Sequence, residues 1–370
     1  MTFPLGRYQF AIDDRIREAV SAGAIFALNL SGGKDSTMTA HAANAILNSL
    51  GHPRERRLLI HADLGRAEWR STPAAIEKQA AQLGLPLAVV RRTAGDMVAR
   101  WEQRYALGLE QYTELKLGRM RSPWSAASLR FCTAEMKRDV LHRHLRSQYP
   151  GETIVSALGI RHAESSARAK TPVSKVDAKL KRADGTNGIL WHPSIHISTE
   201  DVFAYHREHD LHLHEAYTLH GASRVSCAFC VIASLNDLTV AAGVESNREL
   251  FDHLVGMELE TGFSFQQGRW LADVAPHLLS GQRIKMLAAA KSYAEKRREL
   301  ESQIPKNFLK APTGQKWPWR LPEAEEAAAI ASARRFNSDW IGRNLPFLTA
   351  HSVTAKFEEM ITANKALSEG

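Results

Sequence analysis

One short stretch near the start of the chain has the residue types and order of an anion-binding loop. It consists of Ser31, Gly32, Gly33, Lys34, Asp35 and Ser36. The apolar run 24–30 precedes it, and residues 37–50 have a helical pattern. The glycines let the backbone approach an anion closely, and the N–H groups at a helix start favour negative charge. Lys34 adds positive charge, the serines add hydroxyl donors, and Asp35 could hold a magnesium ion. The stretch therefore predicts a phosphate-binding site.

Further polar residues follow two later apolar runs. Asp63 ends the run 57–63, and Gly159 follows the run 153–158, with Arg161 and Arg168 shortly after it. A guanidinium group can make two parallel hydrogen bonds to a phosphate or carboxylate. We expect Asp63 to touch nucleotide or metal, and Arg161 and Arg168 to bind an anionic group from an exposed loop.

The three cysteines form a third candidate site. Cys227 and Cys230 are spaced as C-x-x-C, and Cys132 lies almost a hundred residues earlier. Three thiolates would leave one iron of a [4Fe–4S] cluster without a protein ligand, because a complete set needs four. Zinc is an alternative, because several histidines precede the pair: His206, His209, His212, His214 and His220. Ordinary packing of unmetallated cysteines is the third. A shared cluster requires the three sulfurs to converge beside the Ser31–Ser36 loop.

The elements that position these residues alternate between strands and helices. Strands are expected at 24–30, 57–63, 87–91, 153–158 and 188–191. Helices are expected at 13–22, 37–50, 72–83, 98–116 and 133–146, the last capped by Thr133. This alternation predicts an α/β fold with a doubly wound, mostly parallel sheet. Ligands bind beyond the carboxyl ends of such strands. The loop, Asp63 and Gly159 all lie at strand ends, so one shared site is predicted.

The composition changes after about residue 240. Helical stretches such as 284–302 and 323–336 follow, with few strand signals. We therefore expect a nucleotide-binding domain at 1–240, with a cysteine-containing insert, and a helical region at 241–370. No apolar run approaches the roughly 18 residues of a membrane span, and three cysteines make no disulfide framework. A cytoplasmic protein is expected, and the net charge of +8 suits a nucleotide or nucleic acid.

Several of these motifs resemble those of one enzyme superfamily. The Ser31–Ser36 loop resembles the SGGxDS loop of the PP-loop ATP pyrophosphatases. Residues 159–169 resemble the G-x-R-x-x-[EQ]-S-x-x-R-A segment of the phosphoadenosine phosphosulfate (PAPS) reductase superfamily, and residues 191–205 resemble its W-x-P…DV-x-x-Y stretch. The context of Cys132 is similar to that in the DndC-like branch, which is linked to DNA phosphorothioation. The resemblance covers roughly residues 20–240 and implies an adenine nucleotide alpha hydrolase-like fold that binds ATP and Mg²⁺.

The resemblance also implies a reaction. ATP would adenylate a substrate for sulfur transfer, with catalytic roles for Lys34, Asp35, Arg161 and Arg168 and an iron–sulfur cluster on the cysteines. The expected acceptor is DNA or tRNA, with tail candidates for contacting it at Trp317, Trp319, Arg320, Arg334 and Arg335. A cysteine desulfurase is a candidate sulfur donor, and an oligomer is compatible with the sequence. Assimilatory PAPS reductases use a cysteine near the C-terminus, whereas none follows Cys230 here. A sulfonucleotide reductase-like enzyme and a non-catalytic nucleotide-binding subunit are the alternatives.

Overall fold

The computed structural model describes residues 1–369, and the chain forms two compact units. The first unit combines residues 1–98 with 127–250, and the second combines 99–126 with the residues from Phe251 onward. Each unit is described by itself. The expected division into 1–240 and 241–370 stays a prediction.

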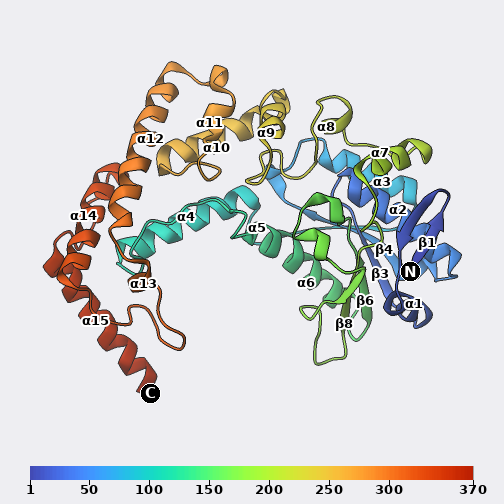
Figure 1. Ribbon diagram of the computed structural model, residues 1–370, viewed down its shortest axis with the longest axis horizontal. Coiled ribbons are helices and arrows are strands. Elements are labelled where there is room, and N and C mark those ends of the chain that lie inside the picture. The colour runs from blue at the N-terminus through green and yellow to red at the C-terminus, as the bar shows by residue number, and fades with distance from the viewer. Residues whose placement is uncertain (370) are drawn as a thin grey trace. The chain divides into compact units, whose positions relative to one another are not determined.

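The first unit is built on a six-stranded sheet (Figure 1). In spatial order the strands are β5 (Leu87–Arg91), β4 (Arg57–Asp63), β3 (Ile25–Asn29), β6 (Thr153–Ala157), β8 (Asn187–Trp191) and β7 (Ser174–Val176). All neighbours are parallel except β7, which pairs antiparallel with β8. The chain builds outward from β3 through β4 to β5, and then returns to β6 on the other side of β3. The doubly wound fold is confirmed, and its switch point lies between β3 and β6.

Alternating side chains of the central strands divide the core between the two faces of the sheet. Phe26 and Leu28 of β3 share a core with the helices that cover one face. These helices are α1 (Asp14–Ser21), α2 (Lys34–Ser49), α3 (Thr72–Leu83) and α7 (Thr199–Glu208). Ile25 and Ala27 share the opposite core with α6 (Asp139–Gln148). Successive strand residues point to opposite faces, so a five-residue apolar strand can fill both cores.

The structure differs from the expected elements in three places. An antiparallel hairpin, β1 (Thr2–Leu5) and β2 (Tyr8–Ala11), and the edge strand β7 were not expected. The helix after the Ser31–Ser36 loop begins at Lys34, three residues earlier than expected. Thr133 was expected to cap a helix and does not, because helical hydrogen bonding already starts at the Arg130 carbonyl. Thr133 therefore ends the short helix α5 (Phe131–Thr133), and a π-helical turn at 134–138 leads into α6.

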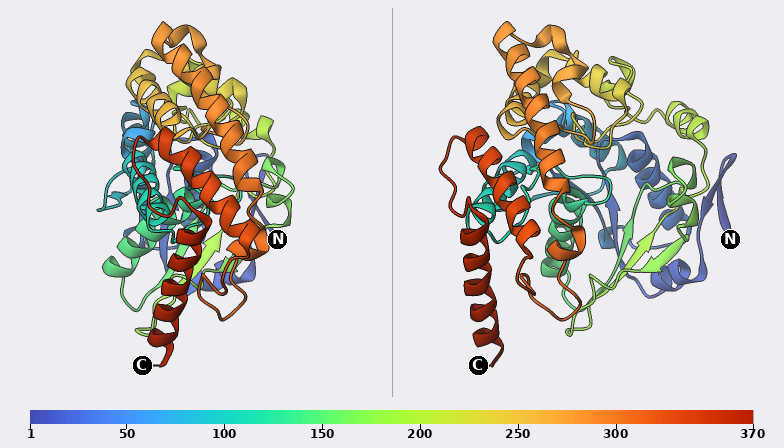
Figure 2. Two further views of the ribbon diagram at one scale, coloured as in Figure 1. Left: turned by 90° about the vertical axis from the view of Figure 1, so that its left-hand side faces the viewer. Right: turned by 60° about the vertical axis from the view of Figure 1, so that its left-hand side comes forward.

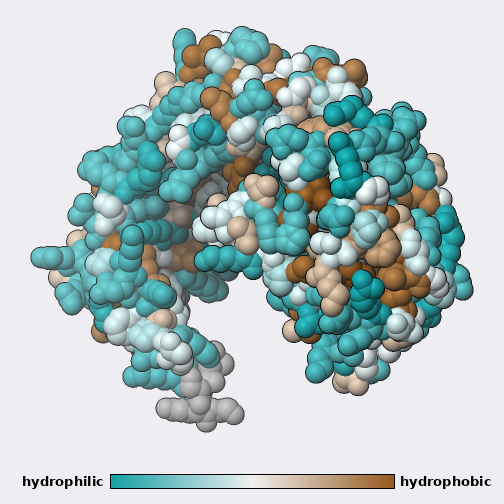
Figure 3. Space-filling view, turned by 45° about the vertical axis from the view of Figure 1, so that its right-hand side comes forward, coloured by the Kyte–Doolittle hydropathy of each residue, from teal (hydrophilic) through white to brown (hydrophobic). Residues whose placement is uncertain are grey.

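The second unit is helical, as expected for the C-terminal region (Figure 2). Its longest helices are α4 (Met97–Thr113), α12 (Gly281–Ser302), α14 (Ala324–Ile341) and α15 (Ala350–Glu369), and most of the shorter α10 (Arg248–Thr261) also belongs to it. Helix α14 packs against both α12 and α15 around a core that includes Phe308, Ile330 and Phe357. Within residues 1–369, no helix is long and apolar enough to span a membrane. Hydrophilic side chains cover most of the face shown in Figure 3.

Candidate functional site

The Ser31–Ser36 loop joins the end of β3 to the start of α2 and is closed by its own hydrogen bonds. The Ser36 hydroxyl donates to the Gly33 carbonyl at 2.8 Å and accepts from the Ser31 N–H at 3.1 Å. Gly32 has φ +75°, a left-handed conformation that side chains other than glycine rarely adopt. The loop is thereby held in a tight turn at the switch point of the sheet.

The end of β6 packs directly against this turn. A Cβ atom added at Gly159 would lie 2.7 Å from the Asp35 carbonyl oxygen and 2.8 Å from the Ser36 nitrogen. Only glycine allows the two backbones to approach so closely. The structure therefore brings together the loop and Gly159, which the sequence analysis placed at one site.

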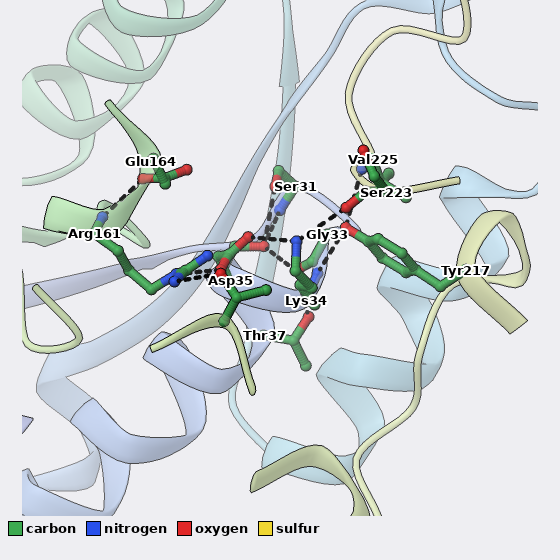
Figure 4. A network of polar contacts seen from close by, with 12 residues as sticks. Ser31, Gly33, Lys34, Asp35, Thr37, Arg161, Glu164, Tyr217, Ser223 and Val225 are labelled. Atoms are coloured by element: carbon green, nitrogen blue, oxygen red, sulfur yellow. Dashed lines mark hydrogen bonds and ion pairs between the residues drawn. The ribbon is translucent and has the colours of Figure 1, made fainter. Parts of the chain in front are cut away.

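Asp35 forms ion pairs with two cations at the mouth of the loop (Figure 4). Its carboxylate lies 2.6 Å from Arg161 Nε and 3.2 Å from Lys34 Nζ. The Arg161 side chain also donates to the Ile197 carbonyl at 3.1 Å and to the Thr199 hydroxyl at 3.3 Å. Arg161 is only 3% exposed, so the expectation of an exposed loop arginine is wrong for this residue. It holds the loop, α7 and the chain after β6 together.

The Lys34 side chain is buried, and it contacts two residues that the sequence analysis did not single out, Tyr217 and Ser223. Its Nζ atom donates to the Ser223 carbonyl at 3.3 Å and lies 5.2 Å from the centre of the Tyr217 ring. The Tyr217 hydroxyl accepts hydrogen bonds from the Lys34 N–H at 3.3 Å and the Val225 N–H at 3.0 Å. No sequence motif marks Tyr217 or Ser223, because their role depends on tertiary contact.

The other predicted polar residues have local partners in the structure. The Asp63 carboxylate accepts from the Gly65 N–H at 2.7 Å and lies 3.3 Å from Arg91 Nη2. Arg168 forms an ion pair with Glu164. The same Glu164 carboxylate accepts from the backbone N–H of Arg161 at 2.8 Å, so it links the two predicted arginines.

The three cysteines belong to the first unit, and two of them affect the pKa of the third. All three are free thiols and half-buried. Burial raises the pKa of Cys227 to about 12, and the nearby Cys230 and Cys132 thiols raise it too, while Lys137 opposes them. The chain at Cys227 forms an antiparallel bridge with Glu68, just beyond the end of β4. Within residues 1–369, however, no group of three or more His, Cys, Asp or Glu residues is arranged to hold a metal ion.

The buried histidines named as zinc candidates make structural hydrogen bonds. His206 Nε2 is 2.8 Å from the Lys34 carbonyl oxygen. His214 Nδ1 accepts from the Ala216 N–H at 3.0 Å, and its Nε2 is 3.2 Å from the Thr72 hydroxyl. Burial lowers the pKa of His214 to about 4, so this ring is neutral at ordinary pH.

The aromatic and basic residues proposed for nucleic-acid contact have partners within the second unit. Arg334 is fully buried and donates to the carbonyls of Tyr112, Thr113 and Pro346. Arg320 pairs with the Glu326 carboxylate. The Trp319 indole donates to Phe308, Trp317 packs on Phe357, and Arg335 donates to Leu348. Arg334 is therefore a core residue, and its proposed contact with nucleic acid is wrong.

Comparisons with known proteins identify one matching family. The family described as "Phosphoadenosine phosphosulfate reductase domain" matches residues 25–233, more than half of the chain. Phosphoadenylyl-sulfate reductase from Candida auris is 16% identical, over 57% of this chain and 85% of its own, with a TM-score of 0.36. FMN adenylyltransferase from Candida glabrata is 12% identical, over 55% of each chain, with a TM-score of 0.33. No curated protein matches. The chain belongs to the phosphoadenosine phosphosulfate reductase domain family, whose fold binds nucleotides for sulfur chemistry.

Proposed function

We propose that the protein is an ATP pyrophosphatase, which cleaves ATP between the α- and β-phosphates and transfers AMP to an acceptor oxygen. One observation carries this proposal. The Ser31–Ser36 loop lies at the switch point between β3 and β6, with the N-terminus of α2 directly behind it and Gly159 packed against it. A helix N-terminus at this place in an α/β sheet favours a bound phosphate.

The side chains around the loop suit this reaction. The loop N–H groups and Lys34 would hold the pyrophosphate, while Arg161 and Arg168 would stabilise charge that develops on the α-phosphate. Asp35 is the proposed magnesium ligand, and magnesium would neutralise the leaving pyrophosphate. Asp35 pairs with Lys34 and Arg161 in this structure, so binding of magnesium would exchange one of these ion pairs for a metal bond. The two remaining predicted site residues, Asp63 and Gly159, would contact the bound nucleotide.

The acceptor step would insert sulfur into nucleic acid. Cys132, Cys227 and Cys230 are the residues that would hold a [4Fe–4S] cluster, with zinc as the alternative. Such a cluster would offer an open iron for sulfur, and a cysteine desulfurase is the proposed source of that sulfur. Cys230 and Cys132 lie close enough to Cys227 to raise its pKa, which supports a common site. Sulfonucleotide reduction is the alternative activity, and sulfite release from PAPS would favour it.

The test of ATP cleavage is product analysis. Incubation with ATP and Mg²⁺, with and without DNA or tRNA, should release AMP and pyrophosphate. Ser36→Ala should lower turnover by about 100-fold, the scale of losing a preorganised contact to the reacting group. Ser49→Ala is the matched control, because the Ser49 hydroxyl bonds only the Ala45 carbonyl on the exposed far end of the same helix. ADP and phosphate as the main products would refute the assignment.

The cluster is tested separately. Anaerobic reconstitution of the protein with iron and sulfide should give a broad absorbance band at about 400 nm and roughly four irons per chain. Each single Cys→Ala change at positions 132, 227 and 230 should abolish both. Stoichiometric zinc in the purified protein would instead support the alternative, and absence of both metals after reconstitution would refute a metal site.

A further inference from the structure

A second segment lies against the Ser31–Ser36 loop and carries Cys227, the first cysteine of the C-x-x-C pair. Residues 217–228 run from Tyr217, at the end of α8 (Glu215–Thr218), to the chain just beyond Cys227. At its centre the Ser223 N–H and hydroxyl donate to the Asp237 carboxylate at 2.7 and 2.9 Å. At its far end Ala228 donates to the Ala67 carbonyl at 2.9 Å. The 217–228 segment is thus anchored at Ser223 and Ala228, and it contacts the loop through Tyr217 and Ser223.

One backbone N–H of the loop and one of the segment share the Tyr217 hydroxyl as acceptor (Figure 4). The Tyr217 oxygen accepts from the Lys34 N–H, the first N–H of α2, and from the Val225 N–H. A Cβ atom at Gly33 would lie 3.4 Å from this oxygen and from the Val225 carbonyl. The N–H groups at a helix start are those that an anion would use. The tyrosine oxygen therefore lies where a phosphate oxygen would bind Lys34.

We propose that Tyr217 is a positioning residue that couples anion binding on the loop to the C-x-x-C cysteines. A phosphate oxygen that takes the Lys34 N–H displaces the Tyr217 hydroxyl, and the Val225 N–H loses its acceptor with it. Val225 precedes Cys227 by two residues, so filling the loop removes one of the contacts that hold the cysteine-bearing chain, while the hydrogen bond from Ala228 to Ala67 keeps its far end in place. That the anion is a phosphate rests on the proposed function. The link that the Tyr217 hydroxyl makes between Lys34 and Val225, called the Tyr217 tie below, does not.

The test compares Tyr217→Phe with wild-type protein, using inorganic pyrophosphate as the probe. The substitution keeps the ring beside Lys34 and removes only the oxygen. Tyr205→Phe is the matched control, because its hydroxyl bonds His41 at 2.8 Å on another part of the same unit. The main readout is the alkylation rate of Cys227 and Cys230 by N-ethylmaleimide, followed by peptide mass spectrometry. Calorimetry gives the affinity for pyrophosphate.

Pyrophosphate should accelerate alkylation about fivefold in wild-type protein and in Tyr205→Phe. Tyr217→Phe should react about fivefold faster without the ligand, show no further response, and bind pyrophosphate about fivefold more tightly. In wild-type protein, hydrogen exchange at the Val225 amide should also accelerate with pyrophosphate, a readout that does not depend on how the variant folds.

Three results distinguish failure of this inference from failure of the proposed function. If Tyr217→Phe is alkylated at the wild-type rate without ligand, the tie between Tyr217 and the cysteines is refuted. Unchanged exchange at Val225 on saturation with pyrophosphate would refute it as well. If pyrophosphate does not bind wild-type protein but Tyr217→Phe is still alkylated faster, the Tyr217 tie is supported and the phosphate site is refuted.

Discussion

Replacing Arg161 by alanine should destabilise the first unit. The guanidinium is 3% exposed and bonds Asp35, Ile197 and Thr199. Removing one partner of a buried pair costs about 3–5 kcal/mol when the other charge is left alone. Here the Asp35 carboxylate keeps Lys34 at 3.2 Å and is partly open to water. We therefore expect a loss of about 2–3 kcal/mol, including the hydrogen bond lost by the Ile197 carbonyl.

Thermal unfolding measures this loss. For a unit of about 220 residues, 1 kcal/mol lowers the melting temperature by about 2–4 °C, so Arg161→Ala should melt about 4–12 °C below wild type. Arg168→Ala is the control. The Arg168 side chain is 35% exposed and pairs with Glu164, so its loss should cost less than about 1 kcal/mol.

A double-mutant cycle tests the ion pair between Arg161 and Asp35 directly. The cycle that combines Arg161→Ala with Asp35→Ala should show a coupling free energy of about 1–2 kcal/mol, because the two groups are in direct contact. If Arg161→Ala unfolds within about 1 °C of wild type, or the cycle shows no coupling, the burial and pairing described for Arg161 are wrong.

Three further changes test other parts of the structure. Gly159→Ala should weaken nucleotide binding at least about tenfold, since its Cβ would meet the Asp35 backbone at 2.7 Å, whereas Gly243→Ala, with its nearest atoms at 3.6 Å, should not; equal binding by both would contradict the packing. Burial raises the pKa of Glu258 to about 7, so the folded protein binds an extra proton between about pH 4.5 and 7, and the melting temperature should fall as the pH rises through this range. In Glu258→Gln the melting temperature should fall less over this range. A pH profile of the melting temperature identical to that of wild type would contradict the raised pKa of Glu258. Arg334→Met should lower stability by about 2 kcal/mol or more, because buried carbonyls lose their donor, and should leave DNA binding in a mobility-shift assay unchanged; loss of DNA binding by a folded variant would restore it as a contact residue.

Much of the first unit was predictable because its signals are local. The strand expected at 57–63 and the helix expected at 72–83 have those bounds in the structure. Apolar runs of five to seven residues with polar ends predict buried strands, and their alternation with helices predicts parallel pairing. The loop was predictable for the same reason, since two glycines before a helical pattern restrict the backbone directly.

The surroundings of the loop depend on contacts across long sequence distances. Arg161 is buried because Ile197 and Thr199, more than thirty residues later, accept its hydrogen bonds. Tyr217 reaches Lys34 from a distance of 183 residues. A charged residue in a polar stretch reads as exposed unless its partners are known, and nothing local to Arg161 or Tyr217 identifies them. The edge pairing of β7 was missed in the same way, since three residues are too few for a periodic pattern.

The most direct test of the central claim is a crystal structure with a non-hydrolysable ATP analogue and Mg²⁺. The β- and γ-phosphates should lie within hydrogen-bonding distance of the N–H groups of the Ser31–Ser36 loop, with the α-phosphate facing Arg161 and the Tyr217 oxygen displaced from Lys34. A nucleotide bound away from the carboxyl ends of β3 and β6, or phosphates that make no contact with the loop, would contradict the account.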